Sequence, residues 1–242
     1  MNYEYSACSA RPRLLILLTD ELEESVKVVN SIIERIIGAN YDGAYPKSRF
    51  YIIVIGYNSL PQLLISGNLK KLDENYNRFE TKKENISDGA GGTIEIDRKY
   101  PVWVESMYNY PQMDNYPKAI QLAIEEVKKW GSCHKNLVPA PIVIDISYEQ
   151  NVDQGLEEIE CLKSISTKDG STLFFGCYSD ANYKNNSFFN KIPEAWKYRF
   201  VNQNIEENEY IDGLFNRDKI IGIIDAITYV GNVSFFEYND SQ

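Results

Sequence analysis

The sequence is poor in the residues on which several enzyme classes depend. It has one histidine, His134, and no G-x-S-x-G sequence, so a serine hydrolase with a Ser-His-Asp triad is not expected. Cys133 is adjacent to His134, but no second pair of ligands accompanies them, and a zinc site needs three or four. The cysteines Cys8, Cys133, Cys161 and Cys177 form no C-x-x-C pair. They are predicted to be reduced thiols of a cytoplasmic protein.

Basic residues and long apolar runs are also scarce. The chain has 25 Lys+Arg against 35 Asp+Glu, a formal net charge of −10, and no basic run is longer than two residues. Because this balance repels phosphate backbones, nucleic acid is not an expected partner. The first apolar run covers only residues 14–18 and is followed at once by acidic residues. That run is too short for a signal sequence or a membrane span, so no membrane partner is expected.

Short apolar blocks alternate with segments of helical periodicity along most of the chain. A strand buried on both faces is typical of such a block, and a crossover helix between two such strands makes them parallel. The pattern predicts an α/β fold, a three-layer α/β/α Rossmann-like sandwich with a mostly parallel central sheet. The expected strands cover residues 13–19, 49–56, 140–146 and 172–178. The expected helices cover residues 22–38, 119–127 and 156–165, with a later helix at 220–230 before a strand at 233–236.

The middle of the chain, residues 67–115, breaks both periodicities. It holds a glycine-rich stretch at 89–92, an extended segment at 93–104 that contains Pro101, and many polar residues. We expect long loops around an antiparallel edge strand at 93–104, preceded by a glycine turn. The glycine stretch lacks the G-K-[ST] ending of a phosphate-binding loop. Without a repeat or a sharp composition change, residues 11–236 are predicted to form one domain between tails at 1–10 and 237–242.

Two aspartates stand where strands of an α/β sheet end. Asp20 closes the first expected strand and Asp145 lies near the end of the third, and ligands of open α/β sheets bind at the carboxyl ends of strands. The two carboxylates are candidates for one crevice that holds a hard cation. An alternative for Asp20 is a helix N-cap, with Glu23 completing a capping box. Asp145, between two isoleucines, has no such alternative and needs a partner.

The order of these segments resembles a von Willebrand factor A (VWA) domain, most of all the bacterial stand-alone branch typified by TerY-like tellurium-resistance proteins. The resemblance covers residues 11–203 and implies the same α/β/α fold, with binding of other proteins at a metal-ion-dependent adhesion site. It rests on four segments: LLILLTD at 14–20, FYIIVIGY at 50–57, NYPKAIQLAI at 115–124 and PIVID at 141–145.

The adhesion site that the resemblance implies is degenerate in this chain. The family pattern is D-x-S-x-S, a threonine on a middle loop and a later aspartate. Here Leu22 and Glu24 replace the two serines, and Tyr116 stands at the threonine position. Magnesium requires several oxygen ligands in near-octahedral geometry. We expect no cofactor beyond weakly held Mg²⁺ or another divalent cation, with the ligands Asp20, Asp145, Glu24 and Ser25.

Aromatic residues and methionine lie close together on the segment that leads to the expected carboxyl edge of the sheet, where Asp20 and Asp145 lie. Such residues dominate protein interfaces, so the sequence predicts a non-enzymatic protein–protein interaction module, and the TerY resemblance implies a regulatory or stress-response role. An alternative is that these rings fold back to cover the edge of the sheet. The predicted partner-binding residues are Trp103, Tyr108, Tyr110, Met113 and Tyr116.

An enzymatic alternative uses the same aspartates. A magnesium-dependent hydrolase or phosphoryl transferase would take Asp20 as nucleophile and Asp145 as metal ligand. This arrangement resembles the haloacid dehalogenases, which require a second aspartate two residues after the nucleophile. Leu22 stands at that position, so the interaction module remains the main prediction.

Overall fold

The computed structural model describes most of the chain, namely residues 3, 7–89, 91–110, 115–135, 137–148, 154–178, 190–201, 214–216 and 220–228. The predicted strand at 233–236 and the predicted C-terminal tail at 237–242 lie outside these residues. Within the described ranges, no helix combines the length and the apolar character needed to cross a membrane.

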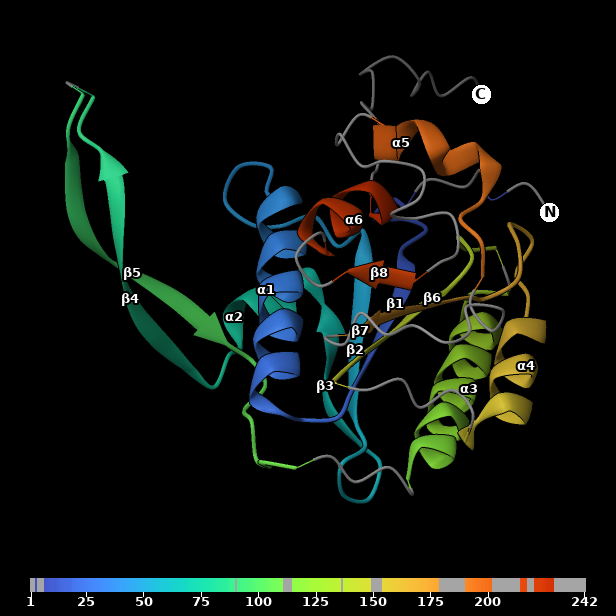
Figure 1. Ribbon diagram of the computed structural model, residues 1–242. Helices are drawn as coiled ribbons and strands as arrows, with labels where there is room; N and C mark the ends of the chain where they lie inside the picture. Colours follow the sequence, from blue (N-terminus) through green and yellow to red (C-terminus); the bar gives the residue numbers. More distant parts are fainter. Residues whose placement is uncertain are drawn as a thin grey trace, which may run out of the picture.

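A mostly parallel sheet forms the centre of the described structure (Figure 1). Its six strands follow the order β3-β2-β1-β6-β7-β8. All neighbouring pairs are parallel except β2 and β3, which are antiparallel. The predicted mixed sheet with one antiparallel edge strand is therefore confirmed. The strands are β1 (Arg13–Thr19), β2 (Phe50–Gly56), β3 (Gln62–Asn68), β6 (Ile142–Ser147), β7 (Leu173–Tyr178) and β8 (Leu214–Asn216).

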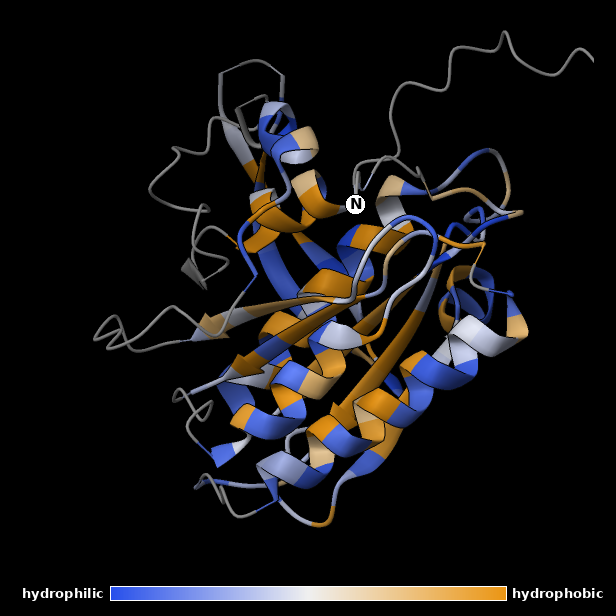
Figure 2. Cartoon of the chain, turned by 90° about the vertical axis from the view of Figure 1, so that its right-hand side faces the viewer, coloured by the Kyte–Doolittle hydropathy of each residue, from blue (hydrophilic) through white to orange (hydrophobic). Residues whose placement is uncertain are grey.

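Helices cover both faces of this sheet because the strand residues alternate in direction. Leu15 and Leu17 of β1 pack with helices α1, α2 and α6, whereas Leu14, Ile16 and Leu18 pack with α3 and α4. Figure 2 shows hydrophobic residues concentrated in the strands and on the helix sides that face them. This arrangement confirms the three-layer sandwich. The helices are α1 (Glu23–Ala39), α2 (Leu69–Glu74), α3 (Tyr116–Cys133), α4 (Leu156–Ser164), α5 (Lys197–Val201) and α6 (Ile220–Ile227).

Residues 67–115 differ from the prediction. The segment predicted as an edge strand is β5 (Thr93–Val102), which pairs with β4 (Arg78–Ser87) in a separate two-stranded sheet. The antiparallel edge of the central sheet is instead β3. Its apolar run is only three residues long before Ser66, Gly67 and Asn68, so it gave no strand signal. The predicted glycine turn joins β4 to β5, and positive φ angles of 77° at Gly89 and 92° at Gly91 explain the glycines.

The chain that returns from this hairpin is fixed to helix α1 by one side chain. Trp103 and Val104, which follow β5, are buried. The Asn30 carboxamide accepts hydrogen bonds from the Trp103 N–H at 3.0 Å and the Val104 N–H at 3.1 Å. It also donates one to the Val104 carbonyl at 2.9 Å. The Asn30 side chain therefore provides the hydrogen-bond partner for three backbone groups that lie beyond the end of the β4–β5 pairing.

Replacing Asn30 by alanine is expected to lower the free energy of unfolding by about 1–3 kcal/mol, because three part-buried backbone groups lose their partner. Urea denaturation of the wild type and the variant measures this. The neighbouring Ser31→Ala is the control, since the exposed Ser31 hydroxyl bonds only within its own helix, to the Lys27 carbonyl, and its loss is expected to cost less than about 0.5 kcal/mol. Equal effects of the two substitutions would contradict the role assigned to Asn30.

Candidate functional site

The structure brings the two strand-end aspartates to the same edge of the sheet. Asp145 of β6 is in register with Leu18 of β1, and Asp20 follows β1 directly. Both aspartates are fully buried. The parallel pairing of β1 with β6 thus places them on neighbouring strands at the carboxyl edge, where α/β folds bind ligands.

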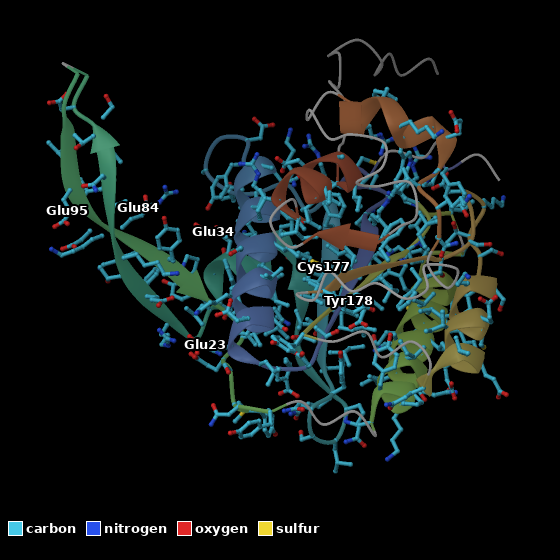
Figure 3. All side chains as sticks on the ribbon, viewed as in Figure 1. Glu23, Glu34, Glu84, Glu95, Cys177 and Tyr178 are labelled. Atoms are coloured by element: carbon cyan, nitrogen blue, oxygen red, sulfur yellow. The ribbon has the colours of Figure 1, made fainter. Side chains whose placement is uncertain are left out.

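Three tyrosine hydroxyls surround the Asp145 carboxyl group. Tyr178 donates a hydrogen bond to Oδ2 at 2.7 Å, Tyr116 donates to Oδ2 at 3.1 Å, and Tyr57 donates to Oδ1 at 3.2 Å. The three tyrosines come from the end of β7, the start of α3 and the residue after β2. All three are fully buried, and Tyr178 is labelled in Figure 3. We call these four residues the tyrosine–aspartate cluster.

Burial is the main influence on ionisation in this cluster. Desolvation raises the pKa of Asp145 from 3.8 to about 7, the tyrosine hydrogen bonds lower it, and the charge of Asp20 raises it. Burial and the nearby Asp145 carboxylate raise the pKa values of Tyr116 and Tyr178 well above 10. Tyr116 and Tyr178 therefore remain hydrogen-bond donors at neutral pH, which lies close to the pKa of Asp145.

Asp20 does not act as the predicted N-cap. Helix α1 begins at Glu23, its N-cap is Leu22, and no side chain caps it. Glu21 has a φ of 57°, which puts a turn between Asp20 and the helix. Asp20 instead accepts hydrogen bonds from the Leu22 N–H at 3.2 Å and the Tyr148 N–H at 2.6 Å. Glu23 pairs with Lys27 at 2.8 Å rather than closing a capping box.

The turn at Glu21 also depends on a glycine in the neighbouring strand. Glu21 is buried, and its Oε1 accepts a hydrogen bond from the Asn58 N–H at 3.1 Å. Burial raises the pKa of Glu21. A Cβ atom on Gly56 would lie 2.5 Å from the Glu21 Cδ atom, so β2 must end in glycine for this carboxyl group to fit. Glu21 is not among the residues that the sequence predicts for the site.

The other proposed metal ligands do not join the two aspartates in one coordination sphere. The Glu24 side chain is 58% exposed and pairs with Lys27 at 3.2 Å. Ser25 is buried, and its hydroxyl has no hydrogen-bond partner among the described residues. In the ranges that the structure covers, no three His, Cys, Asp or Glu residues are grouped to hold a metal. Leu22 offers no oxygen ligand and the Tyr116 hydroxyl is bound to Asp145, so these residues do not fit an octahedral magnesium ion.

Two of the predicted partner-binding residues are buried rather than exposed. Trp103 lies in the core, where its indole N–H donates to the Leu72 carbonyl at 2.7 Å. Tyr116 is equally buried against Asp145. A partner cannot contact either ring, so both assignments are wrong. Met113 lies outside the described residues. Tyr108 is half-buried and Tyr110 is 81% exposed, so these two remain surface candidates.

A groove with a volume of about 330 Å³ lies beside these two tyrosines. The Asn58 carboxamide donates to the Tyr110 carbonyl at 3.0 Å, and the Tyr148 N–H donates to Asp20. Leu22 and Tyr108 form a β-bridge. Contacts to the backbone of its lining residues, one of them from the buried Asp20, therefore fix the walls of the groove. We call it the tyrosine groove; it is lined by Leu22, Glu23, Glu24, Tyr108, Asn109, Tyr110 and Tyr148.

Sequence reasoning missed three tyrosines of this edge, Tyr57, Tyr148 and Tyr178. Tyr57 and Tyr178 each end an apolar strand block, IIVIGY and LFFGCY, at the same edge as Asp145. A hydroxyl-bearing residue at the end of a strand that neighbours a buried carboxyl group is a usable signal, because a buried carboxyl group requires donors. Tyr148 carries no comparable signal, since its backbone rather than its ring contacts Asp20.

No protein-family model and no curated protein matches the sequence. The structure is similar to the crystal structure of the ArnB paralog VWA2 from Sulfolobus acidocaldarius, with a TM-score of 0.42 and 11% sequence identity. The match covers 90% of this chain and 44% of that chain. This chain thus spans less than half the length of that protein.

The raised pKa of Asp145 predicts a specific pH dependence of stability. Between the unfolded value of 3.8 and the folded value of about 7, the folded state holds a proton that the unfolded state has released. Stability must therefore fall as the pH rises through this window, by at most about 4 kcal/mol. Asp145→Asn cannot ionise, so the stability of the wild type relative to this variant is expected to fall from pH 5 to pH 8.

Urea denaturation at a series of pH values measures this difference. The exposed Asp97→Asn serves as the control, and its difference from the wild type is expected to vary little over the same window. A wild type that gains stability relative to Asp145→Asn as the pH rises would show that the folded state favours the ionised carboxylate, against this account.

Proposed function

We propose that this chain is a VWA-type protein–protein interaction module that binds its partner in the tyrosine groove. The proposal includes the TerY-like branch of the family and a degenerate adhesion site that holds a divalent cation weakly or not at all. The observation that carries it is the groove itself, a tyrosine-lined hollow in which the backbones of Leu22 and Tyr148 are bound to the buried Asp20. Interaction sites of this fold lie at the same carboxyl edge of the sheet.

The tyrosine–aspartate cluster supports the degenerate state of the site. In a working site the later aspartate and the loop threonine face the cation. Here Tyr116 at the threonine position donates its hydroxyl to Asp145, and Tyr57 and Tyr178 bind the same carboxyl group. The tyrosine hydroxyls thus occupy lone pairs of the Asp145 carboxyl oxygens that a cation or its water ligands would need. Recognition then depends on the surface above the cluster.

The composition of the groove supports a protein as the partner. Tyr110 is 81% exposed and Tyr148 is 47% exposed, and tyrosine rings provide large contact areas at low entropic cost. The backbone of each is already held, by Asn58 and by Asp20, so binding orders little new structure. The exposed carboxylates of Glu23 and Glu24 at the rim favour a partner segment that carries basic or other hydrogen-bond-donating side chains.

The alternative of magnesium-dependent phosphoryl transfer receives less support from the same residues. A nucleophilic carboxylate must reach the substrate, yet Asp20 is fully buried and each of its oxygens accepts a backbone N–H. Asp145 is similarly enclosed by hydroxyls. We therefore propose a non-enzymatic role, regulatory or stress-related, in the cytoplasm. Magnesium-dependent phosphatase activity that is lost in Asp20→Asn would overturn it.

Removing two groove rings is expected to weaken partner binding without weakening the fold. Tyr110→Ala with Tyr148→Ala deletes exposed rings and leaves the anchoring backbone hydrogen bonds in place. We expect affinity to fall at least about tenfold, while the melting temperature changes by no more than a few degrees. The measurement is quantitative capture of proteins from cells that contain the chain, followed by titration of the captured partner.

A matched control separates the groove from tyrosines in general. Tyr45→Ala with Tyr198→Ala removes two exposed rings outside the groove and is expected to retain the partner. A partner lost from the groove variant and kept by the wild type and the control supports the proposal. Equal capture by all three proteins would show that the tyrosine groove is not the binding site.

A further inference from the structure

A hollow with aromatic walls lies where the β4–β5 hairpin leaves the body of the molecule, beside helices α1 and α2 (Figure 1). Its volume is about 440 Å³, which is within the range of small-molecule binding sites. The end of α1, the end of α2 and the base of the hairpin contribute its walls. We call it the aromatic hollow; its ring-bearing and charged lining residues are Glu34, Tyr41, Asp73, Tyr76, Phe79 and Trp103.

Three of the rings in this hollow are accessible and held in place. Tyr41, Tyr76 and Phe79 are between 37% and 47% exposed, so a bound molecule can reach them. The rings of Tyr76 and Phe79 lie against each other, with centroids 4.4 Å apart. Between them in the sequence, Asn77 donates from its carboxamide to the Trp103 carbonyl at 2.9 Å. The segment that carries both rings is therefore fixed to the chain that follows β5, and binding orders little new structure.

The charged side chains of the hollow are acidic. Among the described residues that line it, these are Glu34 and Asp73. Glu34 is half-buried and is labelled in Figure 3 on the side of α1 that faces the hairpin. Burial raises its pKa, and the nearby charges of Arg98 and Lys82 lower it. The Asp73 carboxylate accepts the Tyr41 hydroxyl at 2.6 Å. Neither carboxylate forms a salt bridge with a described residue, so the hollow holds negative charge without a paired cation.

The end of helix α1 adds to this negative potential. Gly38 lies in the last turn of the 17-residue helix and lines the hollow. The C-terminus of a helix carries a partial negative charge of about half a unit, which favours cations nearby. That last turn contains no basic residue, and the whole chain carries a net charge of −10. The hollow therefore attracts cations and repels anions.

We infer that the aromatic hollow binds a small organic cation with a methylated quaternary ammonium group. The face of an aromatic ring attracts a cation within about 6 Å of its centroid, and Phe79 already has one such contact within the chain, with the Lys99 ammonium at 5.8 Å. An unmethylated ammonium needs acceptors for its three N–H donors when it leaves water. A quaternary ammonium has no such need and presents apolar surface to the rings, while the two carboxylates balance its charge.

Calorimetric titration of the full chain with choline, at constant ionic strength, tests this inference. We expect saturable binding with a dissociation constant of about 1 mM or lower. Two analogues separate the contributions of the methyl groups and of the charge. Ethanolamine keeps the charge without the methyl groups, and the analogue with carbon in place of the choline nitrogen keeps the shape without the charge. Each analogue is expected to bind at least about tenfold more weakly than choline.

Two double variants with the same change in net charge test where choline binds. Glu34→Gln with Asp73→Asn removes both carboxylates of the hollow, keeps the size of the side chains, and is expected to raise the dissociation constant at least about tenfold. Asp42→Asn with Glu74→Gln removes two exposed carboxylates that do not line the hollow and is expected to change it by no more than about twofold. Tyr76→Leu keeps an apolar side chain without the ring and is expected to raise it about fivefold.

Three results would overturn the inference: no binding of choline at millimolar concentration, equal binding of choline and either analogue, or equal weakening by the two double variants. The comparison of ligands uses the unaltered chain, so it does not depend on the folding of any variant. The aromatic hollow lies at the end of α1, whereas the tyrosine groove lies at its start. Failure of one site in its own experiment therefore leaves the proposal for the other unaffected.

Discussion

The hydrogen bonds between Asp145 and three tyrosine hydroxyls are the interaction on which this edge of the molecule depends. A fully buried carboxyl group is costly unless hydrogen-bond donors surround it. Here the donors come from the end of the adjacent strand β7, from the residue that follows β2, and from the first residue of helix α3. The same contacts that make Asp145 tolerable therefore hold the carboxyl edges of β2 and β7 and the start of α3 in one arrangement.

This constraint connects the interior to the proposed function. Asp20, beside the cluster, uses its carboxylate to fix the backbone of Leu22 and Tyr148, and both residues line the tyrosine groove. In the proposed function, the buried Asp20 thus supports the walls of the surface that binds the partner.

Much of the fold followed from the sequence because the strands are buried on both faces. Apolar blocks such as residues 13–19 and 140–146 have few alternatives to a parallel strand, and parallel pairing then places Asp20 beside Asp145. Strand β3 could not be predicted in the same way, because its polar C-terminal half resembles a loop. The capping box failed because the positive φ of Glu21 is not visible in a D-x-x-E pattern. Tyr116 was misassigned because its partner, Asp145, lies 29 residues away in the sequence.

The measurement that tests the central claim most directly is ¹³C NMR of the Asp145 carboxyl carbon as a function of pH, with and without millimolar magnesium. The account predicts a titration midpoint near 7, displaced from the ordinary aspartate range by burial among tyrosines, and no change when magnesium is added. A midpoint near 4, or a midpoint that magnesium moves to lower pH, would show that the carboxylate is solvated or binds the cation. Either result would contradict the account of a buried carboxyl group that is held by tyrosine hydroxyls rather than by a cation.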